Sequence, residues 1–337
     1  MQYVPVLSAD GKPLMPCHAA RARELVRKGR AVRRFRKGFF YIQLLDRKDG
    51  ALQPVACGID PGSKWEAFSV VGPKHTYINI HADAVTHVKE NVEKRRMLRR
   101  NRRYRKTPNR KPRFNRSRGS IPPSTKARWG WKLRIAAFLI RLYPITTFVV
   151  EDVKAKTQEG ARRWNAHFGP LQIGKQWFYN ELCKFAPVVL RNGWETKQLR
   201  ERYGLKKISQ KSAETFNAHA VDAWVLAADA VGASHPTTQL LIRLAPLRFR
   251  RRSLHLQNPA KGGVRRRHGG TVSLGLRRGT QVIHTKFGFC YVGGHMGNRL
   301  SLHSMRDGKR LTQNARREDI IVLTPCSWRA WIPKEGR

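Results

Sequence analysis

Acidic residues are scarce in this sequence: 22 Asp and Glu stand against 68 Lys and Arg in 337 residues, giving a formal net charge of +46. Solubility requires no such imbalance, and a field of this size attracts a polyanion and releases its counterions. We therefore expect a nucleic acid as the partner. A packing protein of the ribosomal or histone type would share this charge. The 40% hydrophobic residues and nine Trp are enough for a folded core and argue against a disordered basic tail.

Cysteine is scarce as well, and long apolar runs are missing. The five cysteines are scattered and contain no C-x-x-C pair, so we expect neither a disulfide framework nor a structural zinc site. No run approaches the roughly 20 apolar residues that a membrane span requires. Residues 1–16 lack the apolar segment of a signal peptide. These absences predict an intracellular protein in a reducing compartment, without a membrane partner.

Two of the few acidic residues end apolar runs that are typical of buried strands. Asp60 ends the run at residues 55–60, and Glu151 ends the run at residues 147–151. Burying a charge is costly unless it is paired or bound to a cation, so both positions suggest a site. Asp60 precedes Pro-Gly and could instead be a turn residue, and Glu151 could be paired with one of the many arginines.

A third carboxylate follows on a helix predicted over residues 218–231. This helix carries Asp222, with His219 three residues earlier on the same face. The two could form an ordinary pair on the helix surface. If the two strands are neighbours and the helix packs on them, Asp60, Glu151 and Asp222 converge, and divalent cations would relieve their mutual repulsion.

Such a cluster suits two Mg²⁺ ions roughly 4 Å apart, which would stabilise the attacking and leaving oxygens at a phosphodiester. Oxygen ligands select Mg²⁺, or Mn²⁺ in its place, over zinc. His219 could take a proton from the attacking water or orient it. Asp152 is excluded because it points to the opposite side of its strand from Glu151. Asp229 is excluded because it lies two helical turns, about 10 Å, beyond Asp222.

The most basic segment, residues 94–118, has 14 Lys or Arg among 25 residues and no acid. Residues 88–106 lack Gly and Pro and are predicted to be helical, whereas the prolines at 108, 112, 122 and 123 favour extended chain. A dense helix of one charge sign repels itself unless phosphates surround it, so we expect nucleic-acid contact here. The arginines expected to make this contact are Arg95, Arg96, Arg99, Arg100, Arg102, Arg103, Arg105, Arg110 and Arg113.

The rest of the pattern around the acidic residues predicts an α/β protein with a mixed sheet. Strands at residues 65–71 and 75–80 would follow the first carboxylate strand in a meander. An amphipathic helix at residues 129–143 would lead into the second carboxylate strand.

Smaller modules are expected at both ends of this α/β unit. Near the start, residues 13–16 (Pro-Leu-Met-Pro) are expected to break the chain, followed by a helix at residues 18–28 and a buried strand at 39–45. Near the end, short β-like runs between Gly and polar turns predict a small β-barrel. These runs lie at residues 281–284, 289–292, 300–303 and 320–323.

The motifs, in this order, resemble those of the RuvC nuclease, which has the RNase H-like fold. Gly58-Ile59-Asp60-Pro61-Gly62-Ser63 is similar to its first motif, Val149-Val150-Glu151 to its second, and His219-Ala220-Val221-Asp222-Ala223 to its third. Pro13-Leu14-Met15-Pro16 resembles the signature of the N-terminal domain of IscB-type transposon nucleases. Residues 94–118 are similar to the arginine-rich bridge helix of those proteins, so the resemblance covers most of the chain.

IscB proteins carry a second nuclease, the HNH domain, between the second and third RuvC motifs. Here Asp222 follows Glu151 by only 71 residues, and His167 is the one histidine between Glu151 and His219. The sequence thus resembles IsrB, the relative without HNH, described as an RNA-guided nickase of the non-target DNA strand. The resemblance implies one RuvC site, a large structured guide RNA (omega RNA) bound by one protein, and target duplex DNA with a short adjacent motif. It also implies the cytoplasm of a prokaryote.

The resemblance divides the chain into five parts. They are a PLMP-type module at 1–50, RuvC part I at 51–85, the bridge helix and basic linker at 86–128, RuvC parts II and III at 129–232, and a basic linker with a β-rich module at 233–337. The last module would read the adjacent motif, or would bind only the RNA. Its candidates for phosphate or base contacts are Arg265, Arg266, Arg267, Arg277 and Arg278.

Two other functions stay open at this point. One is a RuvC-like transposase or resolvase that uses the same metal site without RNA. The other is a non-enzymatic RNA-binding protein whose carboxylates are structural. Dependence on Mg²⁺ separates the second from the enzymes, and dependence on RNA separates the two enzymes.

Overall fold

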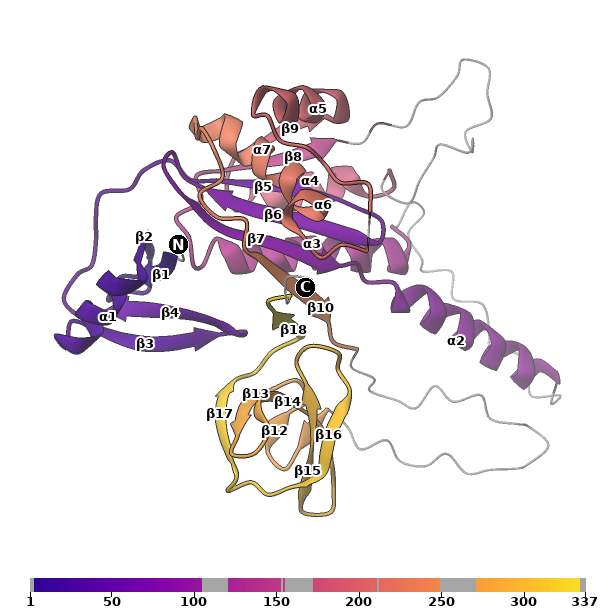
Figure 1. The fold of residues 1–337 in the computed structure, drawn as a ribbon. Coiled ribbons are helices and arrows are strands. Elements are labelled where there is room, and N and C mark those ends of the chain that lie inside the picture. The colour runs from indigo at the N-terminus through magenta and orange to yellow at the C-terminus, as the bar shows by residue number, and fades with distance from the viewer. Residues whose placement is uncertain are drawn as a thin grey trace, which may run out of the picture. The chain divides into compact units, whose positions relative to one another are not determined.

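The computed structural model describes residues 3–104, 121–152, 154, 172–210, 212–248 and 271–333. The chain forms two compact units (Figure 1), of which the first comprises residues 1–84, 129–246 and 328–337 and the second residues 85–128 and 247–327. The first unit holds an N-terminal sheet and a larger central sheet, and the second holds a basic helix and a C-terminal sheet. The predicted α/β class with a mixed sheet is confirmed.

The N-terminal sheet has the strand order β2-β1-β4-β3. Its elements are β1 (Tyr3–Leu7), β2 (Pro13–His18), α1 (Ala19–Arg27), β3 (Ala31–Arg36) and β4 (Phe39–Leu44). The prediction that residues 13–16 break the chain is wrong, because they belong to β2, which pairs antiparallel with β1. β2 lies at the edge of the sheet, where a proline removes no donor that a neighbouring strand needs.

The central sheet has seven strands in the order β18-β10-β7-β6-β5-β8-β9. β5, β6 and β7 form an antiparallel meander, and β8 and β9 continue from β5 in parallel. On the other side β10 pairs parallel with β7, and β18 pairs antiparallel with β10. The predicted meander after Asp60 is confirmed, and the two carboxylate strands β5 and β8 are neighbours. The strands are β5 (Ala56–Asp60), β6 (Trp65–Val71), β7 (Thr76–Asp83), β8 (Thr147–Asp152), β9 (Val188–Asn192), β10 (Leu241–Pro246) and β18 (Trp328–Trp331).

Helices cover both faces of this sheet (Figure 1). They are α3 (Pro123–Leu139), α4 (Lys175–Cys183), α5 (Gly193–Arg202), α6 (Phe216–His219) and α7 (Val221–Val231). Successive residues of β6 point to opposite faces. Glu66 points to α3, where its carboxylate forms a buried ion pair with Lys132 at 2.9 Å. Ala67 therefore points to the other face, which α7 covers.

The prediction of one helix over residues 218–231 is wrong, because the structure has two helices there. α6 ends at His219 and α7 begins at Val221, with Ala220 between them at φ −112° and ψ −8°. Hydrogen bonds of the α-helical type still reach Ala220 from both sides, from its N–H to Phe216 O at 2.8 Å and from the Trp224 N–H to its carbonyl oxygen at 2.9 Å.

The helix predicted at residues 129–143 begins earlier than expected. It starts at Pro123, which was expected in extended chain, and ends at Leu139. Proline suits the first turn of a helix because that turn needs no N–H donor. Its buried residues, among them Trp129, Ile135 and Ala136, share one side of the helix. Lys126, Gly130 and Arg134 on the other side are exposed or half-buried, so α3 has one buried and one exposed face, as predicted.

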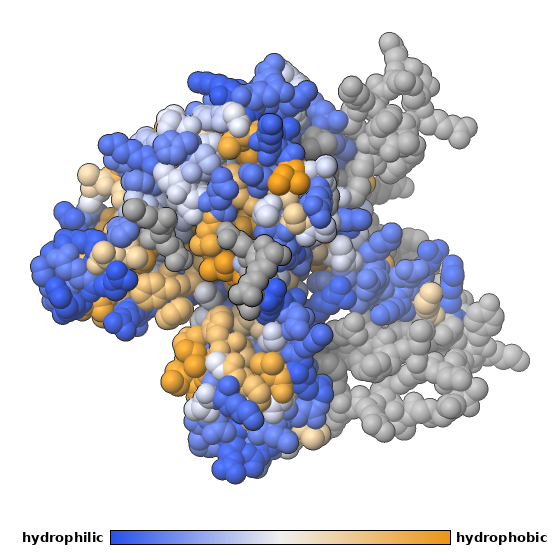
Figure 2. Space-filling view, viewed as in Figure 1, coloured by the Kyte–Doolittle hydropathy of each residue, from blue (hydrophilic) through white to orange (hydrophobic). Residues whose placement is uncertain are grey.

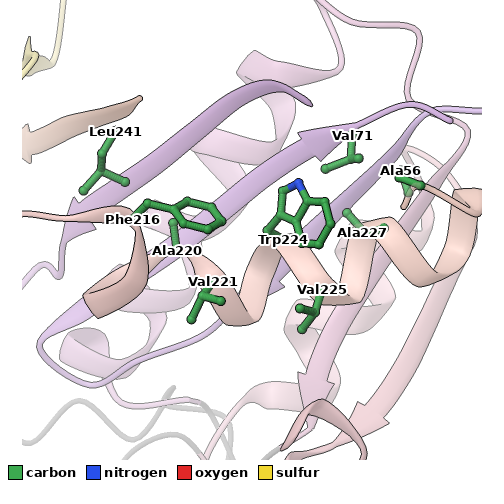
Figure 3. Packing of buried hydrophobic residues seen from close by; sticks show 11 residues of the cluster. Ala56, Val71, Phe216, Ala220, Val221, Trp224, Val225, Ala227 and Leu241 are labelled. Carbon is green, nitrogen blue, oxygen red and sulfur yellow. The ribbon is translucent and has the colours of Figure 1, made fainter. Parts of the chain in front are cut away.

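α7 packs closely on β5 and β6 (Figure 3). Trp224 is completely buried between the helix and the strands, and its Nε1 donates a hydrogen bond to Thr76 Oγ1 at 2.8 Å. On β5 the facing residue is Gly58, where a Cβ atom would lie 1.8 Å from the carbonyl oxygen of Ala223. The missing side chain at Gly58 lets the helix backbone approach the strand, and this approach sets the height of Asp222 above the sheet.

The second unit contains α2 (His87–Tyr104) and a C-terminal sheet of five strands in the order β16-β15-β14-β13-β17. The five strands are β13 (Gln281–His284), β14 (Gly288–Met296), β15 (Arg299–Ser304), β16 (Arg310–Ala315) and β17 (Ile320–Thr324), beside a small ribbon of β11 (Val272–Ser273) and β12 (Leu276–Arg277). The four predicted strands are confirmed, and polar β16 was missed. In the described part of the chain, β13 to β16 form an antiparallel meander and β17 pairs with β13 at the other edge, and no pairing between β16 and β17 closes the sheet into the predicted small barrel. No helix in the described ranges is long and apolar enough to cross a membrane.

We predict that Gly58→Ala lowers the free energy of unfolding by about 2 kcal/mol or more, because the new methyl group collides with the backbone of α7. Gly130→Ala on α3 is the matched control, since a Cβ there meets nothing within 4 Å. It should be neutral or slightly stabilising, because alanine is the better helix former. Urea unfolding followed by circular dichroism measures both, and equal stability of the two variants would contradict the close contact.

Candidate catalytic site

A row of polar side chains crosses one end of the central sheet. The strand register pairs Asp60 of β5 with Ala67 of β6, and Ala67 with His81 of β7. Paired residues on neighbouring strands point to the same face, and Glu151 of β8 joins the row through a hydrogen bond with Asp60. A pocket of 260 Å³ lies over this row. Its lining includes Asp60, Trp65, Ala67, His81, Lys207 and His219.

Glu151 and Asp60 are close enough to share a hydrogen bond, which requires one of the two carboxyl groups to carry a proton. Burial raises the pKa of Glu151 to about 8, and the charges of Asp60 and Asp222 contribute to this rise. The positive charge of Lys207 opposes it. In the metal-free protein at neutral pH, Glu151 is therefore the protonated member of the cluster.

Asp222 is the most deeply buried of the three carboxylates, with 2% of its surface exposed. One of its oxygens accepts a hydrogen bond from Arg200 of α5 and the other from Lys207. Lys207 Nζ also lies 4.0 Å from Asp60 Oδ2. Partial burial acts to lower the pKa of Lys207, but the carboxylates of Asp60, Asp222 and Glu151 outweigh it and raise that pKa. Lys207 is thus a firmly charged cation between two carboxylates.

Sequence reasoning missed Arg200 and Lys207. Their residue type gives no signal in a chain with 68 Lys and Arg. A buried Asp222 does require a positive partner, and this was the one available signal. It could not identify which of the many basic residues the fold brings close.

His219 reaches the pocket from α6. Its ring stacks on that of His81, with ring centroids 3.7 Å apart and an angle of 18° between the planes. Trp65 meets the His219 ring edge-on at 5.6 Å. The structure therefore places His219 beside the same pocket as Asp60 and Lys207, and its role as proton acceptor stays a prediction.

The two acids that we excluded lie elsewhere. Asp152 accepts hydrogen bonds from Lys175 Nζ at 2.7 Å and from the Tyr179 hydroxyl at 2.9 Å, both on α4. Asp229 is paired with Arg191 at 3.1 Å and with Arg202 at 3.4 Å. Both carboxylates are thus occupied by partners outside the pocket.

The three carboxylates fit a divalent cation by their chemistry. Asp60, Glu151 and Asp222 supply hard oxygen donors, and the raised pKa of Glu151 reflects a crowding of negative charge that a cation relieves. In the described part of the chain, no three His, Cys, Asp or Glu side chains already surround a common point. The oxygens of Asp222 are directed at Arg200 and Lys207 instead. Metal binding therefore requires these two contacts to be exchanged.

The predicted nucleic-acid contacts are described only in part. Arg95, Arg96 and Arg100 are exposed on α2, and Figure 2 shows hydrophilic residues along this helix. For three more arginines of α2 the structure describes the helix backbone alone: Arg99, Arg102 and Arg103. In the C-terminal unit Arg277 is exposed and Arg278 is half-buried. The following lie outside the described residues: Arg105, Arg110, Arg113, Arg265, Arg266 and Arg267.

We predict that Glu151→Gln stabilises the metal-free protein at pH 8 but not at pH 4.5. The pKa of Glu151 rises from 4.5 to about 8 on folding, so between these values the unfolded chain releases a proton that the folded chain keeps. Glu151 therefore opposes folding increasingly as the pH rises to about 8, and glutamine removes this cost of about 1 kcal/mol or more.

Urea unfolding in EDTA at both pH values measures the effect. Glu181→Gln is the control, because Glu181 lies at the surface beside Lys184. An equal gain in stability for both variants, or none for Glu151→Gln at pH 8, would show that Glu151 is not held protonated.

The comparisons with known proteins match one family model, described as RRXRR protein, to residues 4–164. α2 contains the pattern Arg-Arg-Asn-Arg-Arg at residues 99–103. The comparison with curated proteins found no match.

Two solved structures of RuvC from Thermus thermophilus are similar. The one in complex with a Holliday junction substrate is 16% identical, with a TM-score of 0.29, and the match covers 54% of this chain and 99% of that chain. The other is 14% identical, with a TM-score of 0.28 and the same coverage of 54% and 99%. The segment that matches the RRXRR family model is slightly less than half of the chain, and it contains β5, α2 and β8.

Proposed function

We propose that the chain is a metal-dependent endonuclease that is guided by RNA and nicks the non-target strand of duplex DNA. One observation carries the proposal: Asp60, Glu151 and Asp222 meet from two parallel strands and a helix, in a protein of net charge +46. A phosphodiester suits both features. The basic surface attracts the polyanion, and the carboxylates offer the ligands that phosphodiester hydrolysis by metal ions requires.

Asp60, Glu151 and Asp222 would hold two Mg²⁺ ions, which stabilise charge on the attacking and leaving oxygens. Glu151 gives up its proton when the three carboxylates act as ligands. Asp222 would exchange its hydrogen bonds with Arg200 and Lys207 for the metal. These two basic side chains would then be free to bind the anionic substrate.

His219 is the residue that we assign to proton transfer. Its imidazole lies at the pocket, and in its neutral form one ring nitrogen accepts a proton from the attacking water.

Guidance by RNA is supported by the N-terminal half of the chain. Residues 4–164 match the RRXRR family, which is found in IscB/IsrB-type proteins. α2 exposes Arg95, Arg96 and Arg100 for phosphate contact. A chain of 337 residues is too small to enclose a long duplex alone, and a bound RNA would complete the channel.

A nick, not a double-strand break, follows from a single site. Every helix and strand described between β8 and α7 belongs to the first unit, as α4, β9, α5 or α6. In that described stretch no second nuclease module is present. One pocket then cuts one strand.

We predict that Asp60→Ala abolishes nicking, with a loss of about 1000-fold or more, because the carboxylate cluster loses one of its ligands. The assay uses the protein with the RNA that co-purifies with it, a supercoiled plasmid carrying the guide-matched target, and Mg²⁺. Asp229→Ala is the control, since Asp229 lies on the same helix as Asp222 but pairs with Arg191 and Arg202. Asp229→Ala should retain nicking. EDTA should stop nicking by both the wild type and Asp229→Ala.

Each other outcome of this assay contradicts a part of the proposal. Retained nicking by Asp60→Ala removes Asp60 from the site. A linear product from cleavage of both strands contradicts the single site. Cleavage without RNA supports a resolvase or transposase, and bound RNA without cleavage supports a non-enzymatic RNA-binding protein.

We predict that reversing the charge of Arg95, Arg96 and Arg100 to Glu weakens the RNA complex and flattens its dependence on salt. Each lost phosphate contact reduces the slope of log K against log salt by about 0.7 to 0.9. The control reverses three exposed lysines of the first unit: Lys48, Lys184 and Lys197. A filter-binding titration at several salt concentrations measures both variants. Equal slopes for the two variants would mean that α2 does not face phosphates.

A further inference from the structure

His81 is a buried histidine that the proposed chemistry does not use. It lies on β7 with 1% of its surface exposed, and neither of its ring nitrogens has a hydrogen-bond partner among the described residues. A buried polar side chain is normally fixed by hydrogen bonds. Here the contacts of the His81 side chain are instead made through the face of its ring.

That face is in contact with His219. The two rings are stacked, with their centroids 3.7 Å apart and their planes 18° apart. Trp65 meets both rings edge-on, at 5.6 Å from His219 and 6.1 Å from His81. All three residues line the pocket that also contains Asp60.

α6, which carries His219, has four residues, about one turn, and its N-cap residue Thr215 makes no side-chain capping hydrogen bond. A single turn is marginally stable without tertiary contacts. The rings packed against His219 therefore contribute to holding its imidazole in place.

The charge of His81 is also constrained. Burial, together with the smaller effects of the nearby Arg243 and His219, lowers its pKa to about 2. Arg243, its partner on β10, is held in place by Asp83 at 2.6 Å and by Glu214 at 3.0 Å. His81 thus stays neutral, so His219 can gain a proton without facing a second charged ring.

We propose that His81 is a positioning residue for His219, whose imidazole it holds in a fixed plane beside the pocket. The inference rests on the proposed function, in which His219 accepts the proton of the attacking water. An imidazole nitrogen accepts a proton along its lone pair, which lies in the plane of the ring. A stack that fixes this plane therefore fixes the direction from which the proton is taken.

The test compares His81→Phe with His81→Leu in the full chain with its co-purified RNA. Phenylalanine keeps a flat neutral ring, whereas leucine fills the space without one. We expect His81→Leu to lower the single-turnover nicking rate at saturating complex by about 10-fold or more, because a misdirected proton acceptor loses much of its contribution. The complex concentration at half-maximal rate should be unchanged. His81→Phe should restore the rate to within about 3-fold of the wild type.

A second comparison separates positioning from a general structural role. If His81 acts through His219, the double variant His81→Leu with His219→Ala is no slower than His219→Ala alone. A further loss in the double variant would overturn the inference. So would an unchanged rate in His81→Leu, or an equal loss in His81→Phe. If His81→Leu does not fold, His81→Asn replaces it, because asparagine is polar and has no ring.

The outcome for this inference is distinguishable from that for the proposed function. Wild-type complex that does not nick in Mg²⁺, and so matches Asp60→Ala, removes the function itself. If the wild type nicks, Asp60→Ala does not, and His81→Leu nicks at the rate of the wild type, only the role of His81 is removed.

Discussion

The repulsion among Asp60, Glu151 and Asp222 is the constraint on which the candidate site depends. Like charges come together here because other contacts hold their elements in place. β5 and β8 pair in parallel, and α7 packs on β5 at Gly58, with Trp224 completely buried. The burial of apolar surface under α7 offsets the electrostatic cost of the cluster. The close contact between helix and strand thus has a chemical consequence, because it sets where Asp222 meets the other two carboxylates.

The metal-free protein limits this repulsion in two ways. A proton stays on Glu151, whose pKa is raised to about 8. Arg200 and Lys207 each bind one oxygen of Asp222. The proton and the two basic side chains each supply positive charge that divalent cations can replace. The same residues therefore serve the folded state without metal and the proposed state with it. Removing either Arg200 or Lys207 without a replacement would leave one oxygen of the buried Asp222 without its partner.

The parts of the site that follow from short patterns could be predicted, and those that depend on distant contacts could not. Asp60 and Glu151 stood out because each ends an apolar run, and the structure brings both to one end of the sheet. The junction of α6 and α7 at Ala220 has no signal in the sequence, since alanine favours helix. His81 and Lys207 are brought to the pocket by a strand register and a loop, which no local periodicity reveals.

A strongly basic chain makes a carboxylate site harder to keep for metal, because an arginine or a lysine is always near. The structure places three carboxylates close together, and this arrangement favours a divalent cation. An ammonium or guanidinium group carries one positive charge and binds mainly to one carboxylate, as Lys207 and Arg200 do at Asp222. Glu151 still needs its proton, so these side chains do not neutralise the cluster completely. A small ion of charge +2 binds several oxygens at once. Lys207 and Arg200 leave part of the repulsion among the carboxylates uncompensated, and this remaining repulsion favours the divalent cation over both side chains.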